Sequence, residues 1–195
     1  MTKKILLLLT LSTMFIINAQ STKREEGLKF GIKAGVNFSN FNGDIENNAM
    51  RNGLHFGLVT EIILSDQFSF QPELLFSAQG YKNETPGAFS KSKFDYIVLP
   101  LLVKYYAIDK LSIEAGPQVG FLINAFDRDN EGNTDIEEQN LVDFSMGLGL
   151  GYEIKNGIFI QGRYNLGTTN VNGADNADAM KYTNSVFQVS IGCLF

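Results

Sequence analysis

The chain alternates between apolar and polar residues from residue 27 to its end. In the first such segment, 27–39, every even position from Leu28 to Phe38 is apolar and every odd position is polar or glycine. A period of two gives a β-strand two chemically different faces. The segment is longer than the usual strand of a soluble protein and long enough to cross a bilayer at a tilt.

Seven further segments repeat the alternation, so the sequence predicts eight strands in all. The other seven cover residues 53–64, 67–81, 93–107, 111–124, 141–155, 157–168 and 183–195. Their connections alternate between tight turns at 65–67, 108–110 and 155–157 and long polar loops at 40–52, 82–92, 125–140 and 169–182. This is the layout of an outer-membrane barrel. We predict an all-β fold, an eight-stranded antiparallel up-and-down transmembrane β-barrel without a second domain.

Alternation does not say which face is the interior, since a soluble lipocalin-like barrel also has eight alternating strands. The membrane is favoured because the apolar faces are nearly free of charge and because the chain ends on an aromatic residue, Phe195. Aromatic residues also gather near the strand ends, as in the interface girdles of membrane barrels. The expected girdle residues are Phe38, Phe41, Tyr81, Phe94 and Tyr96 by the long loops, and Phe30, Phe68, Tyr105, Tyr152 and Phe159 by the tight turns.

Three prolines, Pro72, Pro100 and Pro117, lie inside predicted strands. Proline lacks the backbone donor that a ladder needs. We therefore expect bulges or local bends at these positions.

The N-terminus has the pattern of a secretory signal. Lys3 and Lys4 precede an apolar run, which ends at Asn18-Ala19-Gln20. The run is short for a spanning helix, which argues against an uncleaved membrane anchor. We predict a signal peptide over residues 1–20, cleaved after Ala19 or a residue or so away, and a barrel domain over 21–195. The protein would then be exported through the inner membrane and reside in the outer membrane of a Gram-negative cell.

The polar strand faces carry balanced charge. The charged members are Lys29, Lys33, Glu61, Glu73, Lys104, Glu114, Glu153 and Arg163. An eight-stranded barrel is just wide enough inside for side chains, and an unpaired buried charge is costly. We predict that these eight residues form a structural ion-pair network that plugs the lumen. A small-solute porin or transport component, with some of these residues in a substrate site, is the alternative.

Other candidate chemistry is sparse. One cysteine and one histidine exclude an intrachain disulfide and disfavour a zinc site, and the net charge of −5 argues against nucleic acid as a partner. The acidic run Asp127-x-Asp129-x-Glu131-Gly132 has some likeness to a calcium loop, yet short acidic motifs are frequent by chance. We interpret it as part of a solvated loop and expect no metal and no cofactor.

An acyl hydrolase or acyltransferase barrel is a further alternative, and it needs a nucleophile, a base and an orienting group. The sole histidine, His55, would be the base, with Ser39 or Ser77 as nucleophile and Glu61 as orienter. In the expected register His55 faces the lumen, whereas a lipid enzyme works on the outer face. We therefore predict that the protein is not an enzyme.

Five stretches carry a family resemblance: GIKAGVNFS at 31–39, FQPELLF at 70–76, LPLLVKY at 99–105, AGPQVG at 115–120 and GRYNLG at 162–167. Together they resemble the PorT-like outer-membrane β-barrel family of Bacteroidota. The resemblance implies an integral outer-membrane barrel and carries no mechanism. Expected partners are outer-membrane lipids, the barrel assembly machinery through Phe195, and an unidentified extracellular or membrane protein.

Overall fold

The computed structural model describes residues 26–43, 48–83, 90–128, 133–135, 140–170 and 182–195. The predicted signal peptide, 1–20, lies outside them. The strands are β1 (Gly27–Gly43), β2 (Asn48–Ile63), β3 (Phe68–Asn83), β4 (Ser90–Ile108), β5 (Leu111–Arg128), β6 (Asn133–Asp135), β7 (Val142–Lys155), β8 (Ile158–Gly167) and β9 (Tyr182–Leu194). None of the residues described forms a helix long and apolar enough to span a membrane.

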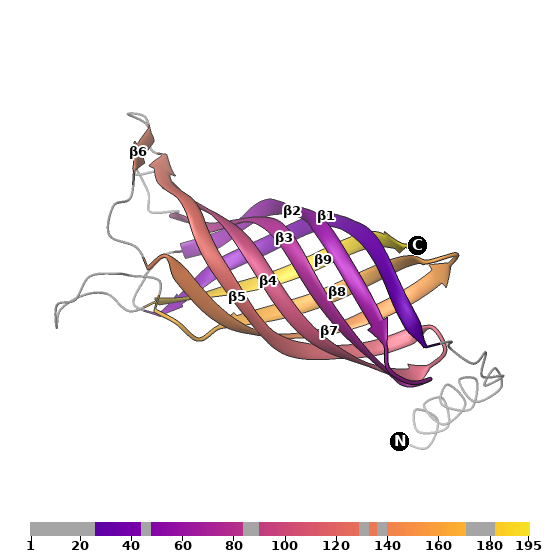
Figure 1. Ribbon diagram of the computed structural model, residues 1–195. Helices are drawn as coiled ribbons and strands as arrows, with labels where there is room; N and C mark the ends of the chain where they lie inside the picture. The colour runs from indigo at the N-terminus through magenta and orange to yellow at the C-terminus, as the bar shows by residue number, and fades with distance from the viewer. Residues whose placement is uncertain (1–25, 44–47, 84–89, 129–132, 136–139, 171–181) are drawn as a thin grey trace, which may run out of the picture.

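Eight of these strands close into a barrel (Figure 1). Each pairs antiparallel with its neighbours in the sequence, and β1 pairs with β9 to complete the ring. At the end of the chain, Phe195 and Phe30 exchange backbone hydrogen bonds of 2.7 and 3.2 Å in both directions. The short strand β6 only extends the far end of β5. The predicted eight-stranded antiparallel up-and-down barrel is confirmed.

The three tight turns lie at one end of the barrel, together with the start of β1 and the end of β9 (Figure 1). Asn156 and Gly157 both have positive φ, 53° and 78°, as the predicted Asn-Gly hairpin turn requires. We call this the turn end and the opposite one the loop end. Because consecutive strands run in opposite directions, the long connections all lie at the loop end.

The strands reach further into the long connections than predicted. β5 continues to Arg128, where Phe126–Arg128 pair with β6 in a segment expected to be loop. Strand segments that extend beyond the lipid need no apolar face. Alternation of apolar and polar residues therefore does not reveal them in the sequence. Asp127 of the acidic run lies in β5, and 129–132 lie outside the described residues.

No bulge lies at the three prolines, so that part of the prediction of bulges or local bends is wrong. The β3–β4 register is the same before and after Pro72 and Pro100, and the β5–β7 register runs through Pro117 unshifted. Ladder pairs are instead missing beside the prolines, at 73–74 opposite 99–100 and at 101–102 opposite 116–117. A missing donor interrupts the ladder locally without inserting a residue. The register shifts lie elsewhere, at Met50/His55, Asp95/Tyr96, Tyr106/Ile108 and Glu153/Lys155.

The apolar strand faces point outward and the polar faces point inward. Large apolar side chains such as Leu58, Leu148 and Ile191 are more than half exposed on the barrel's outside. The buried set is dominated by Ser, Asn, Gln and charged residues. A lipocalin-like barrel has the opposite arrangement, so the soluble alternative is wrong. An outer belt of this size is stable only against lipid.

The expected aromatic girdle is only partly present. Phe30, Phe68, Tyr105 and Tyr152 are exposed on the outside at the turn end, and Phe38 is half-buried beside the exposed Phe187 toward the loop end. In contrast, the side chains of Phe41, Phe94 and Tyr96 toward the loop end and of Phe159 toward the turn end are buried inside the barrel, and Tyr81 packs against the loop-end cluster. These residues occupy lumen-facing positions of their strands. Successive side chains of a strand point to opposite faces, so an aromatic residue at such a position points into the lumen.

A charge on the outer belt should test the membrane orientation. Leu148, in the middle of β7, is 62% exposed on the apolar face, whereas Leu141 is 70% exposed just before the strand. We expect Leu148→Arg to lower the free energy of unfolding in phospholipid vesicles by about 2–4 kcal/mol, and Leu141→Arg by about 0–1 kcal/mol. Urea titrations followed by the gel shift between folded and boiled protein measure both. Equal, small effects would contradict a lipid-facing belt.

Candidate functional site

The centre of the lumen holds a buried arginine between two glutamates. Arg163 of β8 makes a two-pronged contact with Glu73 of β3, with Nη2–Oε1 and Nη1–Oε2 distances of 2.7 and 3.0 Å. Its Nε lies 2.8 Å from Oε1 of Glu114 on β5. These side chains are essentially inaccessible to solvent. Bidentate guanidinium–carboxylate pairs are the strongest ion pairs available to side chains.

A lysine and a glutamine complete this central group. Lys33 Nζ of β1 lies 2.8 Å from Oε2 of Glu73 and donates to Oε1 of Gln161, 2.7 Å away. Gln161 on β8 in turn donates to Glu114 at 2.6 Å. Two positive and two negative groups therefore share the interior, and each buried charge has an opposite partner, as burial requires.

A second set of contacts runs from the centre toward the turn end. Gln71 donates to Glu73 at 2.7 Å and accepts from Lys104 at 3.0 Å. Lys104 Nζ lies 3.8 Å from Oε1 of Glu61, which also accepts a 2.5 Å hydrogen bond from the Tyr106 hydroxyl. The connected group, which we call the lumen network, comprises Lys33, Glu61, Gln71, Glu73, Lys104, Tyr106, Glu114, Gln161 and Arg163.

Six of the eight charged residues that the sequence singled out belong to the lumen network. Lys29 and Glu153 are half-buried near the turn end. Gln71, Tyr106 and Gln161 were not predicted members. Alternation along their strands places them in the lumen. Only the alignment of the strands in the structure shows that they contact charged residues of other strands.

Glycines on β7 provide the room that the central pairs need. Gly147, Gly149 and Gly151 occupy successive lumen-facing positions. A Cβ at Gly149 would lie 2.8 Å from Oε1 of Glu114, and one at Gly147 would lie 3.3 Å from Cδ of Arg163. The arginine and the glutamate therefore lie against a wall that has no side chains.

A second polar group lies on the loop-end side of the lumen network. His55 Nδ1 is 2.7 Å from Oδ1 of Asn37, and His55 Nε2 is 2.7 Å from Oγ of Ser190. Asn37 Oδ1 also accepts from Gln188, while its Nδ2 donates to Ser77. Since Oδ1 only accepts, Nδ1 of His55 carries the proton and Nε2 accepts from the serine hydroxyl.

The serine, histidine and glutamate considered for an acyl-transfer enzyme do not come together as a triad. Ser39 bonds backbone groups of Arg51 and Gly80, Ser77 accepts from Asn37 and Gln79, and Glu61 belongs to the lumen network. The hydroxyl beside the imidazole is Ser190, which the sequence analysis missed. His55 and Ser190 are both ladder partners of Gly35 on neighbouring strands, so only closure of β9 onto β1 reveals the contact. A serine–histidine–asparagine row results, but each member is at least 96% buried and faces the lumen.

An apolar cluster lies toward each end of the lumen. At the loop end Phe41, Phe94 and Tyr96 pack with Leu75 and Val98. Phe41 lies with its ring centroid 5.1–5.3 Å from those of three aromatic neighbours. At the turn end Val59, Phe159 and Leu194 form a smaller cluster. Apolar side chains thus occupy part of the lumen toward each opening.

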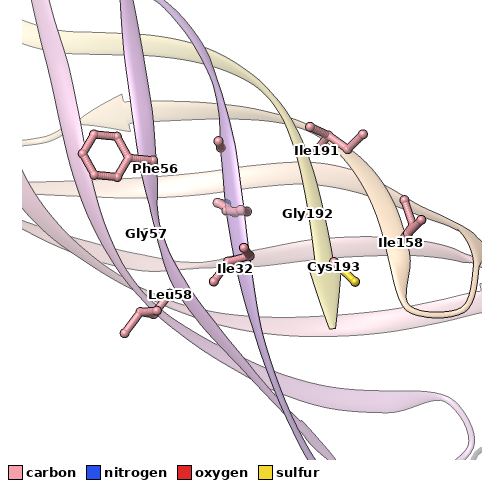
Figure 2. A pocket seen from close by; sticks show the side chains of 10 residues that line it. Ile32, Phe56, Gly57, Leu58, Ile158, Ile191, Gly192 and Cys193 are labelled. Atoms are coloured by element: carbon pink, nitrogen blue, oxygen red, sulfur yellow. The ribbon is translucent and has the colours of Figure 1, made fainter. Parts of the chain in front are cut away.

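A large hollow lies on the outer, lipid-facing side of the barrel rather than in the lumen. It has a volume of about 610 Å³ and runs across β2, β1, β9 and β8. Figure 2 shows Phe56, Leu58 and Ile32 on one side of it and Ile158 and Ile191 on the other, with Cys193 between them. The labelled side chains are apolar or a thiol, so the hollow has the chemistry of the surrounding belt and no group that would fix a polar solute.

The comparisons with known proteins agree with this geometry. Residues 18–173, well over half of the chain, match the family described as outer membrane protein beta-barrel domain. The chain therefore belongs to the outer membrane protein beta-barrel domain family, and its place is the outer membrane. A search of curated proteins found no match.

Solved structures share the fold. Neisserial surface protein A is 13% identical, with a TM-score of 0.59 over 87% of this chain and 100% of its own. The attachment invasion locus protein Ail of Yersinia pestis, solved in complex with the heparin analogue sucrose octasulfate, is 14% identical, with a TM-score of 0.53 over 88% of this chain and 100% of its own. At these identities the likeness concerns the barrel alone.

Removing one charge from the centre should be costly. Glu73→Gln keeps the size of the side chain but removes the negative charge that Arg163 and Lys33 share. We therefore expect the free energy of unfolding to fall by about 3–5 kcal/mol. Glu153→Gln, at the half-buried turn end, should cost less than about 1 kcal/mol. Urea titration in detergent micelles measures both variants. Similar losses for the two would show that the central pairs do not govern stability.

A methyl group on the glycine wall should also destabilise the barrel. Gly149→Ala places a Cβ against Glu114 and the backbone of β8, for which we expect a cost of about 1–3 kcal/mol. Gly162→Ala is the control, because nothing lies within 4 Å of its Cβ position. The midpoint temperature of the heat-dependent gel shift reports both. A neutral Gly149→Ala would mean that the central side chains move aside freely.

Proposed function

We propose that this protein is a structural or interaction barrel with a plugged lumen, which holds its long loops at the cell surface for contact with an extracellular or membrane protein. The lumen network carries the proposal. It crosses the interior from β1, β2, β3, β4, β5 and β8 and leaves each of its six charges paired with an opposite one. A conducting pore would need these groups solvated and apart.

Further points support an interaction role over catalysis or transport. The Ser190–His55–Asn37 row has catalytic residue types but is enclosed in the lumen, away from the acyl chains outside. The apolar clusters toward both openings also oppose passage of ions. The PorT-like resemblance agrees with a non-enzymatic barrel. We propose export by the N-terminal signal and assembly through Phe195, whose side chain is 77% exposed beside β1.

Single-channel recording on the purified full chain tests the plugged lumen. We expect no steady conductance from the wild type in planar bilayers. The double variant Glu73→Ala/Arg163→Ala removes one charge of each sign and empties the centre, so ion conductance should rise. The double variant Lys29→Ala/Glu153→Ala makes the same change in charge at the turn end and should stay closed.

The recordings also discriminate the porin alternative. A large, steady wild-type conductance that the central double variant leaves unchanged would overturn the plugged-lumen proposal. The heat-dependent gel shift of each sample shows beforehand that the protein is folded.

A further inference from the structure

The loop-end half of the lumen holds side-chain oxygens that the lumen network does not use. Oδ1 of Asp143, Oε1 of Gln118, Oδ1 of Asn184 and the hydroxyl of Tyr96 have no hydrogen-bond partner among the described residues. Their side chains are buried, with exposed fractions of 9%, 6%, 3% and 1%. Buried polar atoms in folded proteins are nearly always satisfied. Four such oxygens in one region point to a ligand that accepts their lone pairs.

The strand register brings these residues to one part of the wall. Asp143 is the ladder partner of Gly120, and the Tyr96 ring covers that glycine, 3.3 Å from the position of its Cβ. Gln118 is the next lumen-facing residue of β5, so it is a diagonal neighbour of Asp143. The side chain of Asn184 hydrogen-bonds the Asp143 carboxylate from β9. Four strands therefore contribute one oxygen each.

The wall beneath these oxygens includes two glycines. Gly120 and Gly147 face the lumen on either side of the row that joins Gln118 to its partner Ser145. Above Gly147, Oδ1 of Asn165 is a further buried acceptor with no hydrogen-bond partner, 2.8 Å from the glycine's Cβ position. The Tyr96 ring and Val98 lie over Gly120, and Asn165 and Arg163 lie over Gly147, so the glycines let these side chains approach the wall closely.

The charge of the region indicates the sign of that ligand. Asp143 is the one carboxylate among these side chains, and in the part of the chain described here no lysine or arginine forms an ion pair with it. Glu73 and Glu114, by contrast, each face a cation directly. A buried carboxylate without a cation is strongly unfavourable. A positive ion would compensate it.

The donor atoms indicate which kind of ion. Carboxylate, amide and hydroxyl oxygens suit hard cations, and Ca²⁺ takes six to eight of them. Softer metals need nitrogen or sulfur, but both ring nitrogens of His55 are already hydrogen-bonded and Cys193 lies on the outer face. Among the described residues no group of three or more His, Cys, Asp or Glu side chains could hold a metal ion, so a Ca²⁺ site here would use amide and hydroxyl oxygens beside its one carboxylate.

We propose that Asp143, Gln118, Asn184 and Tyr96 form a Ca²⁺ site in the lumen near the loop end, with Asn165 at its inner edge. A single carboxylate predicts weak binding, at about the 0.1–1 mM of extracellular calcium modules. The site does not depend on whether the barrel conducts.

Terbium luminescence tests the site on the purified, folded full chain. Tb³⁺ substitutes for Ca²⁺ and emits when a nearby aromatic side chain transfers energy to it. The chain has no tryptophan, so tyrosine is the donor, and Tyr96 would lie in the site. We expect emission on adding Tb³⁺, its displacement by CaCl₂, and its loss in Asp143→Asn. Tyr96→Phe should weaken the emission while Ca²⁺ still protects the barrel against heat.

Two control variants separate this site from other carboxylates. Asp66→Asn removes a charge from an exposed tight turn and should leave the emission unchanged. The triple variant Asp127→Asn/Asp129→Asn/Glu131→Gln neutralises the acidic run and should also keep it. Ca²⁺ at ten times its Kd should raise the midpoint of the heat-dependent gel shift by about 3–6 °C in the wild type and in both controls, and not in Asp143→Asn.

Three results would overturn the proposal. Emission and thermal protection that survive Asp143→Asn but vanish in the triple variant would place Ca²⁺ in the acidic run. Absence of both signals from the folded wild type would mean that water alone satisfies these oxygens. A Ca²⁺-free wild type as stable as the Ca²⁺-loaded wild type would show that the carboxylate needs no cation.

Discussion

The demand that every backbone amide and carbonyl find a partner in a medium without water governs this structure. In hydrocarbon an open sheet edge has nothing to bond, so the sheet must close on itself. Closure of β1 onto β9 meets this demand, and the pairing continues to the last residue, where Phe195 and Phe30 bond in both directions. Once eight strands close, the interior is only as wide as the side chains that fill it.

That narrow interior explains why the polar residues are arranged in layers. Charges can be buried there only with partners, and the lumen network places them at the centre, furthest from water at either mouth. The side chains around His55 satisfy one another through neutral hydrogen bonds. Apolar clusters occupy the two ends. The glycines of β7 leave space for the large lumen side chains, since a Cβ at Gly147 would lie close to Arg163 and a Cβ at Gly149 close to Glu114.

The sequence predicted which side chains face the lumen, because this follows from alternation along each strand. It did not predict which side chains touch, because this depends on how the strands are aligned with one another. Period two placed Lys33, Glu73 and Arg163 in the lumen, because a one-residue error would have moved each to the lipid face. The same parity put Phe41 and Phe94 inside, yet their aromatic character suggested a girdle. Contacts such as Ser190 with His55 join the two ends of the chain across the closing seam. No local pattern encodes them, and neither the bridging Gln161 nor the oxygens near Asp143 carry a motif.

The central ion pairs join positions that are far apart in the sequence, with Arg163 ninety residues from Glu73. The guanidinium and its two carboxylates can meet only when β8 faces β3 and β5 across a nearly complete ring. Until then each charge must keep its water, which forbids the half-built sheet from entering lipid strand by strand. We therefore expect insertion and closure to occur together, with the central pairs formed only once β8, the seventh of the eight barrel strands, is in place.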